Sequence, residues 1–262
     1  MLTMFFIFLF FIILLFFLNY KYIFGYYNTI NFSGSVKSDF NVCFIDNFKI
    51  NKGSTKSHGE KVIETFQNYT DVNVKGYKFK RVKFNKKSSI ILKDCDIINY
   101  SMINRKRNEE YLNDIDIFMK NYKGYVVVSS GNDESDTSEI SQWSYIKKNY
   151  PEKEWLERVF IVGEGAVWNS NYNNLKKYMD ISSSYGKEID YIVDKEISQS
   201  KNKLLNGSSF TTPVITSILL NQMSNNKFKL NEKFEILNIK NESRGLDFKD
   251  NNLYKVIIFN TN

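Results

Sequence analysis

The sequence predicts an α/β domain in which a mainly parallel sheet lies between two layers of helices. The first observation is a series of short apolar runs, rich in β-branched residues, that recurs from Phe40 onward. Runs of this kind are typical of strands that are buried on both faces. The second observation is that polar, helix-compatible segments separate the runs, which is the pattern of strands joined by crossover helices.

The individual elements follow in chain order. Four apolar runs are predicted to be strands, namely Val42–Ile45, Ile97–Tyr100, Tyr125–Val128 and Phe160–Val162. Four segments are compatible with helices, namely Glu60–Phe66, Glu109–Asn121, Ser138–Lys148 and Val214–Leu220. Ligand sites in such sheets form beyond the carboxyl ends of the strands. The residues that directly follow the runs are therefore candidates for a functional site: Asp46, Ser101 and Ser129–Asn132.

The composition limits the class of protein. A chain of 262 residues with 42% apolar residues can form one α/β domain with a substantial core. The net charge is +7, but the lysines are scattered and form no dense basic block, so we expect no nucleic-acid partner. Ala166 is the only alanine, a bias typical of an A/T-rich genome. Motif positions that usually hold alanine must therefore hold another residue.

Cysteine and histidine are both scarce. The two cysteines, Cys43 and Cys95, are too few for a disulfide framework or a zinc site. Both lie in strand-like apolar stretches, so we expect buried thiols, with one disulfide as the alternative if the domain is exported. His58 is the only histidine, which excludes a metal site built on several histidines. We predict that no cofactor is required.

His58 is the one side chain that can act as an imidazole base near neutral pH. It follows a flexible stretch, residues 51–56, and precedes an apolar, helix-like run. A lone histidine is more often structural or merely exposed, so by itself His58 indicates no function.

Ser209 is a second candidate. Ser208 or Ser209 is predicted to begin a helix, with Pro213 about one turn further on. Gly207 allows a sharp entry of the chain and the close approach of a carbonyl group. Backbone N–H groups and the positive dipole end at a helix start favour an oxyanion. The alternative is that both serines are only helix N-caps.

Two more polar residues follow predicted strands. The side-chain amide of Asn132 is able to donate a hydrogen bond to an oxyanion. Asp46 lies at the end of the first strand and precedes Asn47. Both positions are equally compatible with ordinary turns.

Seven segments, taken together and in order, resemble motifs of the subtilisin-like family of serine peptidases. Three are similar to the motifs that carry the family's catalytic triad: Val42–Asp46, His58–Val62 and Gly207–Pro213. Four are similar to the motifs that flank the substrate, hold the oxyanion or follow it: Ile97–Ser101, Ser130–Asp133, Tyr150–Pro151 with Phe160–Gly163, and Ser183–Gly186. The resemblance extends from about residue 40 to the C-terminal residue, and it implies a subtilisin-like three-layer fold.

The resemblance implies a serine endopeptidase whose catalytic triad is Asp46, His58 and Ser209. Asp46 would orient His58, which would accept the proton of Ser209 as that hydroxyl attacks the scissile carbonyl. The amide of Asn132 and the backbone N–H of Ser209 would hold the oxyanion. The partner would be a protein or peptide, held as an added strand by these substrate-binding residues: Ser101, Met102, Ile103, Ser129, Ser130 and Gly131.

Several positions depart from the family pattern. Glu60 stands where threonine usually follows His-Gly, and Val193–Lys195 stands near the usual Ala-Pro-Gly. The 19–38 connector leaves no space for a large folded pro-segment. These departures support an alternative, a catalytically inactive protein with the subtilisin fold that is tethered to a membrane and binds peptides. A membrane-anchored nucleic-acid binder is a further alternative, which the motif order does not support.

An acidic loop, formed by Asp133, Glu134 and Asp136, follows the predicted oxyanion residue. One interpretation is that the loop favours a basic side chain at the P1 position of the substrate, and a second is that it holds a structural calcium ion. A loop that is simply solvated is the third interpretation. No ligand pattern in the sequence supports the calcium ion.

The first 18 residues contain one polar side chain, Thr3, and approach the length of about 20 residues that spans a bilayer. We predict a signal peptide or membrane anchor there, and a membrane-associated or secreted domain from residue 39 onward. The lysines that follow favour a cytoplasmic domain, whereas peptidases with such leaders are usually exported, so the side of the membrane stays open. A glycan on the Asn206 sequon would lie against Ser209, which favours a bacterial origin without glycosylation.

Overall fold

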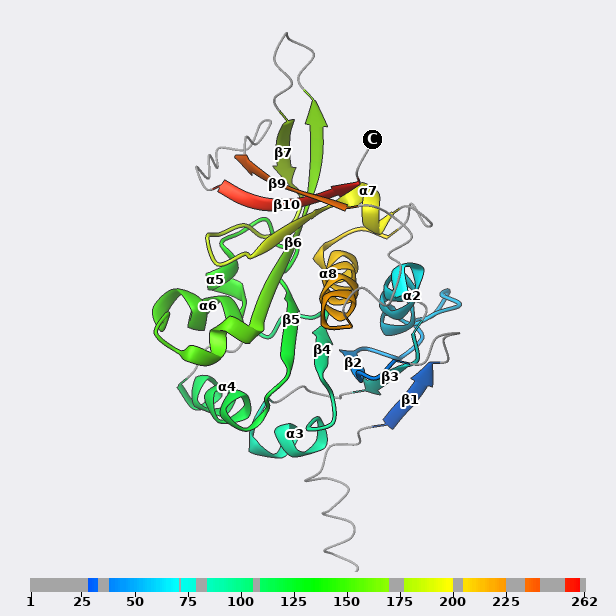
Figure 1. The fold of residues 1–262 in the computed structure, drawn as a ribbon, viewed down its shortest axis with the longest axis vertical. Coiled ribbons are helices and arrows are strands. Elements are labelled where there is room, and N and C mark those ends of the chain that lie inside the picture. The colour runs from blue at the N-terminus through cyan, green and yellow to red at the C-terminus, as the bar shows by residue number, and fades with distance from the viewer. Residues whose placement is uncertain are drawn as a thin grey trace, which may run out of the picture.

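Ten strands form one sheet in the computed structural model (Figure 1). The structure describes residues 28–32, 38–70, 72–78, 84–105, 109–169, 177–199, 205–224, 234–240 and 253–259. The apolar segment 1–18 lies outside these ranges, as does most of the predicted connector. Within the described ranges, no helix has the length and apolar character needed to cross a bilayer.

The sheet is mainly parallel. Its strands are β1 (Asn28–Phe32), β2 (Val42–Asp46), β3 (Val74–Lys78), β4 (Ile97–Tyr100), β5 (Tyr125–Ser129), β6 (Val159–Asn169), β7 (Lys177–Ile181), β8 (Tyr191–Asp194), β9 (Phe234–Lys240) and β10 (Leu253–Phe259). They lie in the order β1-β3-β2-β4-β5-β6-β8-β10-β9, and β7 pairs with the extended end of β6. The neighbours from β3 to β10 are all parallel, whereas β1, β7 and β9 pair antiparallel.

The helices lie on both sides of the sheet (Figure 1). They are α2 (His58–Thr70), α3 (Lys86–Ile91), α4 (Glu109–Asn121), α5 (Thr137–Ile140), α6 (Gln142–Asn149), the 3₁₀ helix η1 (Glu154–Arg158), α7 (Lys195–Ser198) and α8 (Ser208–Met223). The predicted strands and helices are confirmed, except that the segment predicted as one helix over 138–148 is divided at Ser141.

Two separate cores explain why the strand runs are mainly apolar. On β2, Cys43 and Ile45 face a core that also contains residues of α4 and α6. The alternate residues, Val42 and Phe44, face a second core with α2 and α8. Because successive side chains on a strand point to opposite faces, both sets must be apolar when both faces are covered. This confirms the predicted three-layer α/β fold.

Strand β1 lies inside the range that we predicted to be a connector. It pairs with β3 from Asn28 opposite Lys78 to Phe32 opposite Val74. Both strands alternate apolar and polar residues over only five positions, so neither has the continuous apolar run used to predict the buried strands. The sheet therefore begins at residue 28 and not after residue 39.

Helices α2 and α8 cover the same face of the sheet. Helix α4 covers one face, and α8 covers the other together with α2. In the chain, α8 follows β8 and precedes β9, which pairs antiparallel with β10. The start of α8 thus lies on the same face as α2, with which α8 makes extensive contact.

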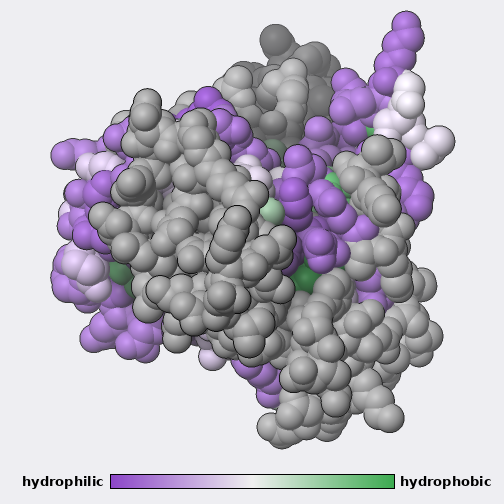
Figure 2. All heavy atoms as spheres, turned by 90° about the horizontal axis from the view of Figure 1, so that it is seen from above, coloured by the Kyte–Doolittle hydropathy of each residue, from purple (hydrophilic) through white to green (hydrophobic). Residues whose placement is uncertain are grey.

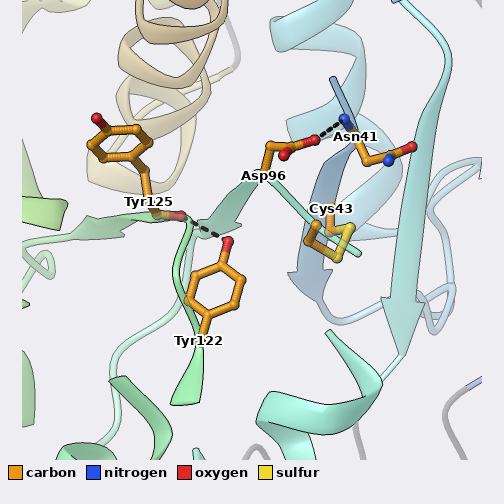
Figure 3. Close-up of a disulfide and its surroundings, with 6 residues drawn as sticks. Asn41, Cys43, Asp96, Tyr122 and Tyr125 are labelled. Carbon is orange, nitrogen blue, oxygen red and sulfur yellow. Dashed lines mark hydrogen bonds between the residues drawn. A yellow bond between two sulfur atoms is a disulfide. The ribbon is translucent and has the colours of Figure 1, made fainter. Parts of the chain in front are cut away.

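Cys43 and Cys95 form a disulfide that joins β2 to the segment before β4 (Figure 3). Their Cα atoms lie 5.8 Å apart, and the sequence separation is 52 residues. Both cysteines are buried as predicted, but the expectation of free thiols is wrong. Next to the disulfide, the backbone N–H of Asn41 donates a 2.7 Å hydrogen bond to the carboxylate of Asp96 (Figure 3). Strands β2 and β4 are thus joined at the end opposite Asp46.

The described surface at one end of the molecule is mainly hydrophilic. Figure 2 shows this face from above, with hydrophobic colour confined to small spots among the described residues. The large hydrophobic side chains that the described chain exposes, Ile50, Ile90 and Tyr150, are far apart in the sequence. Single exposed apolar residues are normal on soluble proteins and need no partner to explain them.

We expect the disulfide to contribute strongly to stability. Loop-closure entropy for a separation of 52 residues predicts that the double variant Cys43→Ala/Cys95→Ala loses about 4 kcal/mol of unfolding free energy. Urea unfolding of the wild type, with and without reductant, and of the double variant measures this loss. The reduced wild type should match the variant, and the variant should not respond to reductant. Identical midpoints for the oxidised and reduced wild type would show that the two thiols are not joined.

Candidate active site

The candidate site lies where the strand order reverses. From β2 the chain crosses to β3 on one side, and it then returns to β4 on the other side of β2. The carboxyl ends of β2 and β4 therefore border the crevice at which open α/β sheets bind ligands. Asp46 ends β2, and Ser101 directly follows β4. Both residues thus lie at the topological switch point.

Asp46 and His58 are hydrogen-bonded. Nδ1 of His58 lies 2.6 Å from Oδ1 of Asp46. The Asp46 side chain is 1% exposed, whereas the imidazole is 36% exposed. Because an ionised carboxylate can only accept hydrogen bonds, the neutral imidazole must carry its proton on Nδ1. Nε2 is then the basic nitrogen.

The carboxylate of Asp46 is nearly cut off from water. Burial raises the pKa of Asp46, and the hydrogen bonds from His58 and from the backbone N–H of Asn47 oppose that rise. Both donors reach the same oxygen, while Oδ2 is buried without a hydrogen-bond partner among the described residues. An anion with so little solvation strongly attracts a positively charged imidazole beside it.

A capping box fixes the position of His58 at the start of α2. The backbone N–H and the hydroxyl of Ser57 each donate a 2.6 Å hydrogen bond to Glu60, whose own N–H donates to Ser57 Oγ. Hydrogen bonds from Ser57 also lower the pKa of Glu60. A Cβ at Gly59 would lie 2.6 Å from the ring of Phe48, so the small residue is required there. Glu60, which replaces the threonine of the family pattern, thus has a structural role. The Ser-x-x-Glu pattern of this capping box can be recognised in the sequence.

Ser208 and Ser209 occupy different environments at the start of α8. Ser208 is buried, and its hydroxyl is hydrogen-bonded to Asn132 and Gly131. Ser209 is half-buried and is the second residue of the helix. The N-cap residue is Gly207, with a φ of 106°, which has no side chain to cap the helix. The N-cap alternative for the two serines is therefore wrong, and Ser209 is the accessible hydroxyl.

Ser209 lies beside His58 but is not hydrogen-bonded to it. The rings of His58 and Phe210 are in contact, with centroids 5.3 Å apart, which places the imidazole against the first turn of α8. The Ser209 hydroxyl donates its hydrogen bond to the carbonyl of Ser101, at 3.0 Å. Among the described residues this is its only hydrogen bond. The structure thus pairs two members of the predicted triad and places the first turn of α8, which carries the third, against the imidazole.

Asn132 is fixed against the start of α8. Its Oδ1 accepts hydrogen bonds from the backbone N–H of Ser208, at 2.8 Å, and from the Ser208 hydroxyl, at 3.0 Å. Because a backbone N–H is always a donor, the amide oxygen must face Ser208, and this leaves Nδ2 as the donor that faces outward. A Cβ at Gly207 would lie 2.6 Å from that Nδ2, so glycine is required there for space as well as for its φ.

The N–H group of Ser209 is a second potential donor. It belongs to the first turn of α8, where backbone N–H groups have no partner within the helix. In the described part of the chain it makes no hydrogen bond of its own. The Asn132 side-chain amide and a free N–H therefore lie at the same helix start.

The predicted substrate-binding residues lie on two chain segments that follow adjacent strands. Ser101 is buried, and its hydroxyl accepts a 2.8 Å hydrogen bond from Asn99. Ser129 and Ser130 are also buried, so their backbone is better placed than their side chains to meet a peptide. Met102 and Ile103 are partly exposed, and Gly131 has a φ of 97°. The two segments border the Ser209 hydroxyl and Asn132.

Two carboxylates of the predicted acidic loop, those of Asp133 and Asp136, are engaged with separate partners. Both oxygens of Asp133 lie 2.8 Å from Nη2 of Arg105. Asp136 accepts hydrogen bonds from Ser138 and pairs with Lys148. Over the described ranges, no group of three or more His, Cys, Asp or Glu side chains converges as a metal site would need.

Glu164 is a residue of the site that sequence reasoning missed. It is fully buried on β6, where its Oε2 accepts a 2.9 Å hydrogen bond from the backbone N–H of Gly207. Its Oε1 accepts the hydroxyl of Ser182, at 3.1 Å. The carboxylate therefore supports the loop that carries Ser209. The sequence did contain one signal for Glu164, namely an ionisable residue in the middle of a buried strand. Such a residue needs hydrogen-bond partners to be stable.

Comparison with protein families and with curated proteins identifies no match for this chain. No protein-family model matches the chain, and no curated protein matches it either. A function for this chain must therefore be argued from the geometry of the described site.

Proposed function

We propose that the chain is a serine endopeptidase that uses Asp46, His58 and Ser209 as its catalytic triad. The observation that carries the proposal is the buried Asp46 carboxylate bonded to Nδ1 of the only histidine, next to the accessible serine at a helix start. The pairing leaves Nε2 as the base on the side of the ring away from the carboxylate. Acyl transfer through an activated hydroxyl is the chemistry that this arrangement supports best.

The reaction begins with a rotation of the Ser209 side chain. Its hydroxyl turns from the carbonyl of Ser101 toward Nε2 of His58, a change of one side-chain torsion. Catalytic hydrogen bonds are often long or misaligned without substrate and tighten when it binds. A peptide that occupies the crevice between the two segments displaces the hydroxyl from Ser101.

Bond formation and bond cleavage then follow the usual order for a serine nucleophile. Oγ of Ser209 forms a bond to the scissile carbonyl carbon as His58 takes its proton. The carbonyl oxygen becomes an anion, which accepts hydrogen bonds from Nδ2 of Asn132 and from the N–H of Ser209. The C–N bond breaks, and His58 returns the proton to the leaving amine. A water molecule then attacks the acyl-enzyme through the same steps and releases the carboxylic acid product.

A catalytically inactive peptide-binding protein is the second candidate. The hydrogen bond from Ser209 to Ser101, in place of one to His58, favours it. In that case the hydroxyl stays bound to the backbone, and the crevice holds a peptide without cleaving it. No cofactor, nucleic acid or calcium ion is part of either proposal.

We further propose that the domain works in an oxidising compartment, attached to or released from a membrane by its apolar N-terminal segment. The Cys43–Cys95 disulfide supports a location outside the cytoplasm, because disulfides are rare in reducing cytosol. The lysines after residue 18 argued for the cytoplasm. A covalent bond between two buried cysteines is the stronger argument, since it forms only where thiols are oxidised.

The nucleophile can be identified by covalent labelling. We expect a fluorophosphonate probe to label the wild type at Ser209, and Ser209→Ala to lose labelling together with peptide hydrolysis. The expected loss in kcat is on the order of 10⁶, the size that removal of this group causes in subtilisin. Mass spectrometry of the labelled peptide separates Ser209 from Ser208. A wild type that takes up no probe and cleaves no peptide would support the binding protein, whereas a variant that hydrolyses peptides equally well would show that Ser209 is not the nucleophile.

The Asn132 amide should act only as charge develops on the carbonyl oxygen. We expect Asn132→Ala to lower kcat by about 10²–10³ with little change in KM, because the donor stabilises the transition state and not the bound substrate. Steady-state kinetics on a chromogenic peptide measures the split between the two constants. Asn121→Ala, at an exposed position that ends α4, is the matched control. A rise in KM at constant kcat would make Asn132 a binding residue instead.

A further inference from the structure

The space for one substrate side chain can be located from the catalytic groups. In the proposed reaction the scissile carbonyl carbon is bonded to Ser209 Oγ, and its oxygen faces Asn132. The hydroxyl of Ser209 lies within hydrogen-bond distance of the Ser101 carbonyl. The side chain on the acyl side of the scissile bond must then enter between the segment after β4, residues 101–105, and the segment after β5, residues 129–133. This is the P1 subsite.

Two branched aliphatic side chains converge on this space. A Cβ built on Gly131 would lie 2.6 Å from Cδ1 of Ile140 and 3.4 Å from Cγ2 of Ile103. The Ser184 hydroxyl would lie 3.2 Å from the same point. Ile103 comes from the segment after β4, and Ile140 comes from α5 on the far side of Gly131. Even a single methyl group on Gly131 would therefore collide with the residues already present.

The two segments are also joined beyond Gly131. The backbone N–H of Gln142 donates a 3.2 Å hydrogen bond to the carbonyl of Asn104. Next to it, the guanidinium of Arg105 pairs with the carboxylate of Asp133. These contacts connect the walls of the subsite at the end away from Ser209. They also neutralise the carboxylate that was considered as a ligand for a basic side chain.

We propose that the P1 subsite accepts only small side chains, such as those of glycine, alanine and serine, and that Ile103 and Ile140 determine this specificity. The inference rests on the proposed peptidase function and adds its substrate class. A large P1 side chain would have to displace both isoleucines and open the contacts behind them. A small one needs no space beyond the backbone groove. Of the carboxylates in the acidic loop, Asp133 and Asp136 are already paired, with Arg105 and Lys148.

The test is a series of chromogenic tetrapeptides that differ only at P1, with alanine, leucine, phenylalanine or arginine. For the wild type we expect kcat/KM to be at least about tenfold higher with P1 alanine than with leucine, phenylalanine or arginine. Ile103→Ala and Ile140→Ala should each raise the phenylalanine-to-alanine ratio by about tenfold or more, because each substitution removes three carbon atoms from the wall. Ile90→Ala, at a 61% exposed position on α3, should leave the ratio unchanged.

The outcomes separate this inference from the proposed function. A wild type that prefers phenylalanine, leucine or arginine at P1 overturns the small-residue subsite while leaving the peptidase intact. The same holds if both isoleucine variants keep the wild-type ratio. Fluorophosphonate labelling at Ser209 in each variant measures the folded, active fraction, so a loss of folding cannot be mistaken for a change in specificity. Absence of labelling in the wild type overturns the peptidase and this inference with it.

Discussion

The site depends on one buried hydrogen bond, between the carboxylate of Asp46 and Nδ1 of His58. The chain has a single histidine, so no other imidazole can replace it as a base. The carboxylate is 1% exposed because β2 lies inside the sheet, with β3 and β4 on its two sides and a helical layer on each face. Burial of the anion is unfavourable by itself, and it is offset by the donors that converge on Oδ1. The same burial strengthens the attraction for an imidazolium.

The topology of the sheet explains how residues far apart in the sequence meet at this bond. The reversal of strand order beside β2 opens a crevice at the carboxyl ends of β2 and β4. Helix α2 begins there and carries His58. Helix α8 covers the same face of the sheet as α2, and its start, which carries Ser209, reaches the same place.

Local sequence patterns predicted the buried part of the fold well. The runs at β2, β4 and β5 were recognisable because both of their faces are apolar, and Asp46, Ser101 and Asn132 were found because they follow such runs. The edge strand β1 and its neighbour β3 were missed because they are short and half-polar. The Cys43–Cys95 bond was left as an alternative, since pairing depends on strand order, which one sequence does not display.

Contacts between distant segments were the least predictable. The ion pair between Arg105 and Asp133 joins two loops that neither motif nor spacing relates. Glu164 lies under the Gly207 turn only because β6 passes beneath α8. The serine that bears the proposed nucleophile was assigned from a motif, but the distinction between a buried Ser208 and a half-exposed Ser209 required the packing of Asn132 against the helix start.

The central claim can be tested directly by NMR of ¹⁵N-histidine-labelled protein, because His58 contributes the only side-chain signals. The account predicts that the neutral ring carries its proton on Nδ1, with that proton strongly deshielded by the short hydrogen bond to Asp46, and that Asp46→Asn abolishes the deshielded signal. A ring that is protonated mainly on Nε2, with a spectrum that Asp46→Asn leaves unchanged, would contradict the account.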